Sequence, residues 1–143
     1  MSVTFYPEAI QYVKQEVPCY CEGNDPDCYD CKGMGFFMDD VIADGFIEMG
    51  VANRNAALIL ATVLPEKSYE YLCGSWDRSL QDQVAKNILR ILNKDIDKLI
   101  YNDEQYNNFY IQGVDKQRAE RYLTTLLEII HCCKKHNCNL NFA

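Results

Sequence analysis

Four cysteines near the N-terminus form the strongest chemical pattern in the chain. The segment Cys19-Tyr-Cys21 is followed, after a six-residue turn, by Cys28-Tyr-Asp-Cys31. Thiolates are among the commonest ligands of zinc, which prefers four of them in a tetrahedron. Two cysteine pairs that fold back on each other can direct all four sulfurs to one point. The spacing therefore predicts one Zn²⁺ site, and because four protein ligands leave no open position, a structural one.

The residues around these cysteines suit the same purpose. Gly33 and Gly35 follow Cys31, and glycine allows left-handed backbone and the close approach of N–H groups to sulfur. Two other interpretations stay open at this point. The four residues could be ordinary reduced thiols, or Cys28 and Cys31 could form a redox pair.

The second half of the segment resembles a known zinc-binding repeat. Cys28-x-x-Cys31-x-Gly33-x-Gly35 is similar to one repeat of the DnaJ-type zinc finger, in which two such repeats share a zinc ion across a hairpin. The first half departs from that pattern, because Cys19-x-Cys21 lacks one spacer residue and Asp25 stands where the second glycine would be. Cys19 is therefore the ligand with the weakest support. The resemblance ends with this segment, so it implies no chaperone function.

A second group of candidate metal ligands lies near the C-terminus. Cys132 and His136 are four residues apart and share one face of a predicted helix. Together with His131 and Cys138 they could bind a second metal ion. The alternative is that Cys133 lies on the core side of the helix and the other side chains lie at its end, where a cationic His suits the helix dipole.

Polar residues at two predicted helix starts are candidates for ligand binding. Asn53, Arg54 and Asn55 begin one helix, where backbone N–H groups favour anionic or polar ligands. Trp76 and Arg78 precede another helix and could also serve ligand binding. The alternative is that these residues are helix caps and surface residues. The neighbouring Cys73 is interpreted as a small core residue, with a nucleophilic role as the less favoured alternative.

The elements that must position these residues follow from hydrophobic spacing. The sequence predicts helices over residues 6–16, over 53–64 with Asn53 as cap and an end before Pro65, from about 79 to 92 after Asp77 or Ser79, and over 115–135 after Asp115. It predicts extended segments over residues 36–38 and 109–112 and an edge strand over 139–142. We therefore expect an α+β fold with about three to five helices packed on a small sheet. Residues 1–143 are predicted to form a single domain, with a zinc-binding loop over residues 17–36.

Composition narrows the class of partner. The formal net charge is −7, which is opposite to that of a generic phosphate-backbone binder. An acidic protein suits a basic protein surface, although acidity can also serve solubility alone. No apolar run reaches the length of a membrane span, and the N-terminus lacks the pattern of a secretory signal. The expected location is the cytoplasm.

The order of features also resembles a group of small phage and prophage proteins. The cysteine segment precedes Asn53-x-Asn55-Ala-Ala, then Gly74-Ser75, then a closing helix that contains Tyr122-Leu-x-x-Leu126. This resemblance implies a mobile-element origin, a host cytoplasm and an anti-defence role. The leading prediction is a non-enzymatic zinc-containing protein that binds a host protein or a small polar ligand. The alternatives are a nucleic-acid-binding accessory protein and a small enzyme with a cleft near Asn53, Trp76 and Cys73.

Overall fold

The structure, a computed structural model, describes residues 1–64, 73–106 and 109–143. These residues form two compact units. Residues 10–46 make up the first, which we call the cysteine hairpin. Residues 1–9 and 47–143 make up the second, which we call the helical unit. That residues 1–143 act as a single domain stays a prediction.

The helical unit contains a four-stranded antiparallel sheet. Its strand order is β4 (Met49–Ala52), β1 (Ser2–Pro7), β8 (Leu140–Phe142) and β5 (Gly74–Trp76). Successive side chains of a strand point to opposite faces, and in β1, β4 and β8 the buried positions alternate with more exposed ones. One face of the sheet therefore belongs to the hydrophobic core.

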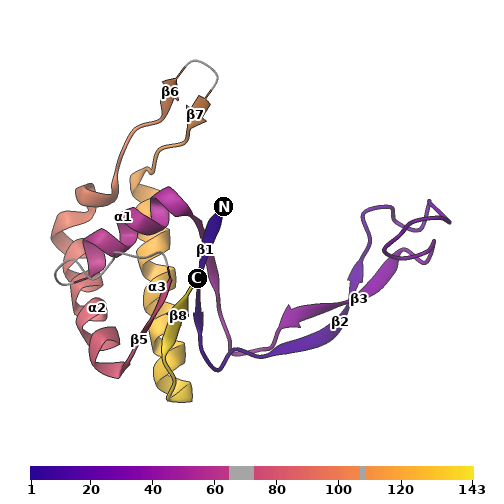
Figure 1. The fold of residues 1–143 in the computed structure, drawn as a ribbon, viewed down its shortest axis with the longest axis horizontal. Helices are drawn as coiled ribbons and strands as arrows, with labels where there is room; N and C mark the ends of the chain where they lie inside the picture. The colour runs from indigo at the N-terminus through magenta and orange to yellow at the C-terminus, as the bar shows by residue number, and fades with distance from the viewer. Residues whose placement is uncertain (65–72, 107–108) are drawn as a thin grey trace. The chain divides into compact units, whose positions relative to one another are not determined.

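Three α-helices are described, and they pack on the buried side of this sheet. They are α1 (Asn53–Val63), α2 (Arg78–Arg90) and α3 (Lys116–His136) (Figure 1). Phe5, Trp76 and Phe142 form an aromatic cluster, with ring centroids 5.4 to 6.2 Å apart. The core contains buried apolar residues from all three helices and from β1, β4, β5 and β8.

Aspartate side chains cap the N-termini of α2 and α3. The side chain of Asp77 accepts a hydrogen bond from the backbone N–H of Leu80 at the start of α2, and Asp115 accepts one from Arg118 at the start of α3. Helix α2 continues into a π-helical turn, Ile91–Asp95, and a 3-10 helix, Ile96–Leu99. Between this segment and α3, β6 (Glu104–Tyr106) pairs with β7 (Phe109–Ile111).

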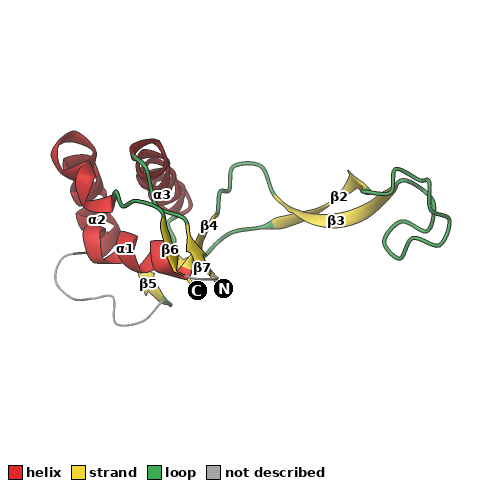
Figure 2. Ribbon diagram, turned by 90° about the horizontal axis from the view of Figure 1, so that it is seen from above, coloured by secondary structure: helices red, strands yellow, loops and turns green. Residues whose placement is uncertain are grey.

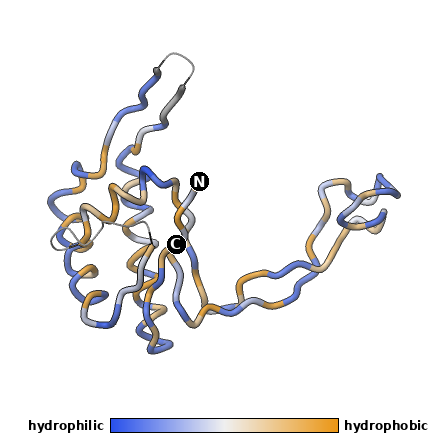
Figure 3. Tube along the Cα trace, in the orientation of Figure 1, coloured by the Kyte–Doolittle hydropathy of each residue, from blue (hydrophilic) through white to orange (hydrophobic). Residues whose placement is uncertain are grey.

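The cysteine hairpin consists of two long strands and a loop. β2 (Tyr12–Pro18) and β3 (Phe36–Ile42) pair antiparallel from Tyr12↔Ile42 to Pro18↔Phe36. Residues 19–35, which we call the cysteine loop, connect the two strands (Figure 2). Apolar and polar stretches alternate along the strands and the loop (Figure 3).

The mixed α and β fold is confirmed, with the number of described α-helices at the lower limit of the predicted range. The helix predicted over residues 6–16 is wrong, because this segment forms the end of β1 and most of β2. Pro7 suits the first turn of a helix, but it ends a strand here and pairs with Leu140. The segment's long-range partners, β3 and β8, override its local pattern.

Two smaller predictions also need correction. Asn53 does not cap α1, because the N-cap position is Ala52 and no side chain caps this helix. The C-terminal strand is not at an edge, because β8 lies between β1 and β5. Helix α1 ends at Val63, as the sequence predicted to within a residue, whereas Pro65 lies outside the described residues.

Candidate metal centre

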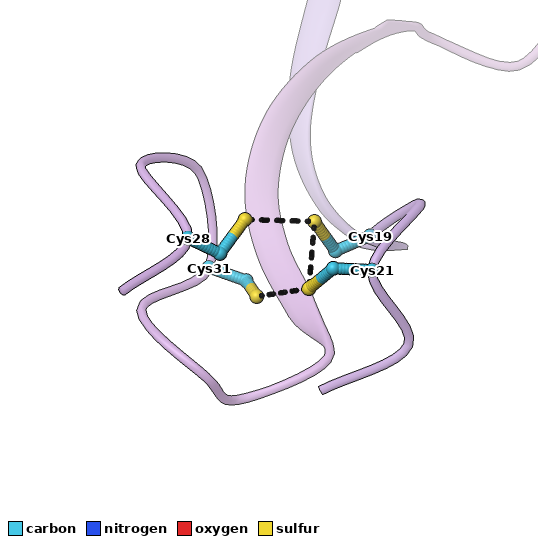
Figure 4. A group of neighbouring side chains, drawn as sticks. All are labelled: Cys19, Cys21, Cys28 and Cys31. Carbon is cyan, nitrogen blue, oxygen red and sulfur yellow. Dashed lines mark hydrogen bonds between the residues drawn. The ribbon is translucent and has the colours of Figure 1, made fainter. Parts of the chain in front are cut away.

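The cysteine loop brings four sulfur atoms together at the end of the hairpin. The Sγ atoms of Cys19, Cys21, Cys28 and Cys31 all lie within 4.8 Å of one another. Figure 4 shows two of the side chains on each side of the cluster, with their sulfurs directed toward a common centre. The sequence prediction that these four residues converge is confirmed, including Cys19, whose short spacer left it with the weakest support.

The sulfur–sulfur distances fit a tetrahedral metal site. The Sγ–Sγ distances are 3.6 Å for Cys19 and Cys28, 3.7 Å for Cys19 and Cys21, and 3.2 Å for Cys21 and Cys31. A tetrahedron with Zn–S bonds of about 2.3 Å has edges of about 3.8 Å. A disulfide bond is much shorter, at about 2.05 Å, and all four cysteines are free thiols. The cluster can therefore hold one metal ion after small movements of the side chains.

The two halves of the loop repeat the same backbone turn. Glu22 and Lys32 each follow a cysteine and have positive φ angles of 52° and 51°, and the next residues, Gly23 and Gly33, have φ angles of 79° and 84°. The N–H of Asn24 donates to the carbonyl of Cys21 at 2.9 Å, and the N–H of Met34 donates to that of Cys31 at 3.0 Å. The spacer between Cys19 and Cys21 is one residue shorter than the spacer between Cys28 and Cys31. The turn after Cys21 is nevertheless the same as the turn after Cys31.

The glycines of the loop are required by close packing as well as by their φ angles. A Cβ atom on Gly33 would lie 3.0 Å from Cα of Pro26, and one on Gly35 would lie 3.2 Å from the backbone nitrogen of Gly23. Gly33 and Gly35 also place their backbone N–H groups against the sulfur of Cys31. Gly23 does the same for Cys21. Such outer hydrogen bonds orient ligands and stabilise thiolates.

The same contacts give the four thiols different acidities. Burial disfavours the thiolate of Cys31, but hydrogen bonds from the Cys21 thiol and from the N–H groups of Gly35 and Gly33 outweigh it and lower its pKa to about 6. For Cys19 the backbone N–H of Cys21 lowers the pKa, but burial and the other three thiols raise it to about 12. A thiolate at Cys31 thus makes the removal of further protons harder.

The pKa values of Cys21 and Cys28 are also shifted in opposite directions. The hydrogen bond with Cys31 raises the pKa of Cys21. The backbone N–H groups of Cys31 and Asp30 lower the pKa of Cys28. Without a cation the loop therefore favours one or two thiolates over four, and a divalent ion would displace the remaining protons.

The structure describes the surroundings of three of the predicted ligand-binding residues. Asn55 is buried, its amide donates to the Tyr122 hydroxyl at 3.2 Å, and its side-chain oxygen accepts from Tyr101. Arg54 lies over the ring of Tyr101, 4.8 Å from its centroid. Trp76 is buried in the aromatic cluster of the core. Ligand binding by Asn53, Arg54, Asn55, Trp76 and Arg78 stays a prediction.

A hollow of about 880 Å³ lies in the helical unit beside Tyr101, the residue that contacts both Arg54 and Asn55. It is lined by residues 100–103, 112–118 and 121, which include none of the five predicted ligand-binding residues.

The C-terminal histidines and cysteines do not form a second cluster. Within the described part of the chain, which includes residues 131–138, the only convergent group of three or more metal-ligating side chains is that of the cysteine loop. Cys133 is fully buried on the core side of α3, as the alternative interpretation expected. The interpretation of Cys73 as a small core residue is wrong, because this cysteine is exposed.

Sequence reasoning missed the apolar side chains around the centre. Met34, Phe36 and Met38 are exposed, whereas Phe37 packs against the cysteines. Their roles depend on the strand register, which is not evident from hydrophobicity alone. The available signal was the run Met34-Gly-Phe-Phe-Met38 directly after the last cysteine.

Comparison with known proteins gives no relative. No family model matches the chain, no curated protein matches it, and no solved structure matches its fold. The expected relation to small phage and prophage proteins is therefore without support. None of the helices in the described residues is long and apolar enough to cross a membrane.

Proposed function

We propose that this chain is a non-enzymatic binding protein whose cysteine loop holds one structural Zn²⁺ and whose cysteine hairpin contacts a protein partner. One observation carries the proposal. Among the residues whose burial is described, nine large apolar side chains are exposed, and seven of them belong to the hairpin: Tyr12, Val13, Tyr20, Tyr29, Met34, Phe36 and Met38.

The choice of zinc rests on the donor set. Four thiolates in a tetrahedron favour zinc or iron over the hard cations, which prefer oxygen. The backbone N–H groups against the sulfurs suit the net negative charge that a Zn²⁺ ion and four thiolates share. Because Cys19, Cys21, Cys28 and Cys31 would fill all four positions, the ion would stabilise the loop rather than bind a substrate.

The metal would replace the core that the hairpin lacks. Its buried cluster consists of Cys19, Cys28 and Cys31, with only Cys21 and Phe37 packed against them. An isolated two-stranded hairpin is marginal in water, and the binding free energy of a structural zinc ion is available to fold such an element. A fixed loop can then present apolar side chains without burying them.

Exposed apolar side chains at this density favour a binding surface. Single apolar residues on a surface need no explanation, but contiguous groups mark interaction sites. Met34, Phe36 and Met38 line one groove of about 240 Å³, so they form such a group. The hairpin's charge opposes the nucleic-acid alternative, because residues 10–46 hold eight acidic and two basic residues.

The test is affinity capture with matched variants. Full-length protein, the triple variant M34S/F36S/M38S and the control L89S are immobilised, after each has been shown to contain one zinc ion. Leu89 is exposed on α2 of the helical unit. We expect one cellular protein to be retained by the wild type and by L89S but lost with the triple variant. Equal retention by all three, or retention by none, would refute the proposed function.

A further inference from the structure

We infer that the partner of the cysteine hairpin is a basic protein segment. In this proposal one apolar side chain of the segment enters the groove beside Cys31, and neighbouring Lys or Arg side chains pair with Asp27 and Asp30. The inference rests on the proposed function and adds the chemistry of the partner.

The groove has the size and lining of a pocket for an apolar side chain. Its volume of about 240 Å³ is several times the ~30 Å³ that a water molecule occupies in the liquid. Met34, Phe36, Phe37 and Met38 supply its apolar surface, and Asp30 and Lys32 contribute its polar rim. Methionine side chains adapt to different apolar shapes, which suits a peptide-binding surface.

The strand register explains why these side chains are available. Phe36 and Met38 lie on the same face of β3, opposite Pro18 and Glu16 of β2. Phe37 points to the other face, where it packs against the cysteines. Phe37 thus packs against the cysteines with part of its surface, and Phe36 and Met38, 37% and 58% exposed, are left for a partner.

A second hollow continues this surface. It has a volume of about 650 Å³ and is lined by Pro26, Asp27, Cys28, Tyr29 and Asp30 together with Lys32 and Phe37. Asp30, Lys32 and Phe37 line both hollows. The side chain of Tyr29 is 94% exposed and adds an aromatic contact. A peptide in the groove therefore has two carboxylates, Asp27 and Asp30, within the same surface.

The distribution of charge selects a cationic partner. The cysteine hairpin has a formal charge of −6, from eight acidic and two basic residues, whereas the rest of the chain has a charge of −1, from thirteen acidic and twelve basic residues. A Zn²⁺ ion bound by four thiolates would add a further −2 to the hairpin. Lys32 is the one basic residue of the cysteine loop, which also contains Glu22, Asp25, Asp27 and Asp30.

Other occupants fit this surface less well. A second copy of the chain would bring an equal negative charge to the same contact, and like charges in an interface are repulsive. Nucleic acid and anionic lipid headgroups would be repelled for the same reason. A basic segment gains from the field of the hairpin, and its apolar side chain gains from burial in the groove.

The test uses the full-length zinc-loaded protein and three fluorescent peptides of equal length. One peptide alternates Leu with Lys, the second alternates Ser with Lys, and the third alternates Leu with Glu. Binding is measured by fluorescence anisotropy at low and at moderate ionic strength. We expect the Leu/Lys peptide to bind at least tenfold more tightly than either other peptide. Its affinity should fall several-fold with added salt, because ions screen the charges.

Variants assign the binding to the proposed surface. We expect D27N/D30N and M34S/M38S each to weaken the Leu/Lys peptide by about fivefold or more, since every substituted side chain lines one of the two hollows. D44N, which removes one negative charge from the connector after β3, and L89S should change the affinity by less than twofold. Zinc content is measured for each variant, so that loss of the metal is not mistaken for loss of a contact.

The outcomes separate this inference from the proposed function. Equal binding of the Leu/Lys and Leu/Glu peptides would overturn the inference, and so would equal weakening by D44N and D27N/D30N. Self-association of the wild type in sedimentation, lost in M34S/M38S, would overturn the inference as well. In those cases capture of a cellular protein by the hairpin would still support the proposed function. Failure of that capture would instead remove both.

Discussion

The helical unit and the cysteine hairpin are stabilised by different physical means. Residues such as Phe5, Ile88 and Leu126 are almost fully buried in the first, and the core there includes all three α-helices and the four-stranded sheet. In the hairpin the buried residues are cysteines. Hydrophobic burial is sufficient for a unit of about a hundred residues, but smaller elements need disulfides or a metal. The comparison predicts that the two units respond to different perturbations.

The largest expected effect is the loss of a metal ligand. Replacing Cys28 by Ser should weaken zinc binding by more than about 100-fold. The loss is expected to exceed that from removing a hydrogen bond to a ligand, because a ligand itself is lost. The amides of β2 and β3 should then exchange freely with solvent, because their pairing depends on the metal. Hydrogen exchange with mass spectrometry measures both units at once.

The control for this variant is Cys73→Ser, which changes an exposed cysteine outside the cluster. It should leave zinc content and exchange unchanged. Simultaneous exposure of α1, α2 and α3 in C28S would contradict the separation of the two units.

The complementary change creates a cavity in the helical unit. Leu126 of α3 is fully buried, so Leu126→Ala should lower the free energy of unfolding of this unit by about 2 to 5 kcal/mol. The zinc affinity of the cysteine loop should stay the same. Urea unfolding followed by circular dichroism, with zinc release followed by a colorimetric chelator, distinguishes the two events. A matched Leu89→Ala variant on the exposed side of α2 should have little effect on either.

Zinc affinity should rise with pH. The pKa of Cys19 is raised to about 12 and that of Cys21 is raised above its usual value, so near neutral pH both thiols hold protons that zinc must displace. Each displaced proton adds about a tenfold gain in apparent affinity per pH unit, so these two thiols alone give about 100-fold or more between pH 7 and 8. Below pH 6 the dependence should become steeper, because Cys31, with a pKa of about 6, also becomes protonated.

Competition with a chelator of known pH dependence measures this slope. Calorimetry in buffers of different ionisation enthalpy counts the protons directly. A slope below one proton would contradict the assignment of raised pKa values to Cys19 and Cys21.

The smallest effect concerns the turn after Cys31. Gly33→Ala places a side chain at a φ angle of 84° and 3.0 Å from Cα of Pro26, so zinc affinity should fall by roughly tenfold. Gly45→Ala is the matched control, because Gly45 has a similar φ of 86° but nothing within 4 Å of its Cβ position. It should leave zinc affinity unchanged. Equal losses in the two variants would show that backbone strain alone, and not the geometry of the loop, weakens the site.

The comparison of the two units also shows what the sequence could predict. The cysteine cluster was predictable because its four thiols lie within thirteen positions, so local geometry fixes most of the site. Helices α2 and α3 were predictable for a similar reason. Their caps, Asp77 and Asp115, and their apolar stripes are local signals.

The extended segments predicted over residues 36–38, 109–112 and 139–142 overlap with β3, β7 and β8. The strands at the N-terminus were missed because their partners are distant. Residues 6–16 were interpreted as a helix, but β1 pairs with β4 and β8, and β2 pairs with β3. Neither pairing can be deduced from the segment itself. The register of β2 and β3 decides that Phe36 and Met38 are exposed while Phe37 packs against the cysteines. The groove was therefore not evident from the sequence either.

The central claim is that one zinc ion bound by four sulfurs organises the cysteine hairpin. X-ray absorption spectroscopy at the zinc edge, on reduced protein purified without added metal, tests it most directly. We predict one zinc per chain with four sulfur neighbours at about 2.3 Å. Absence of metal, a shell with nitrogen or oxygen in place of sulfur, or disulfides between Cys19, Cys21, Cys28 and Cys31 would contradict it.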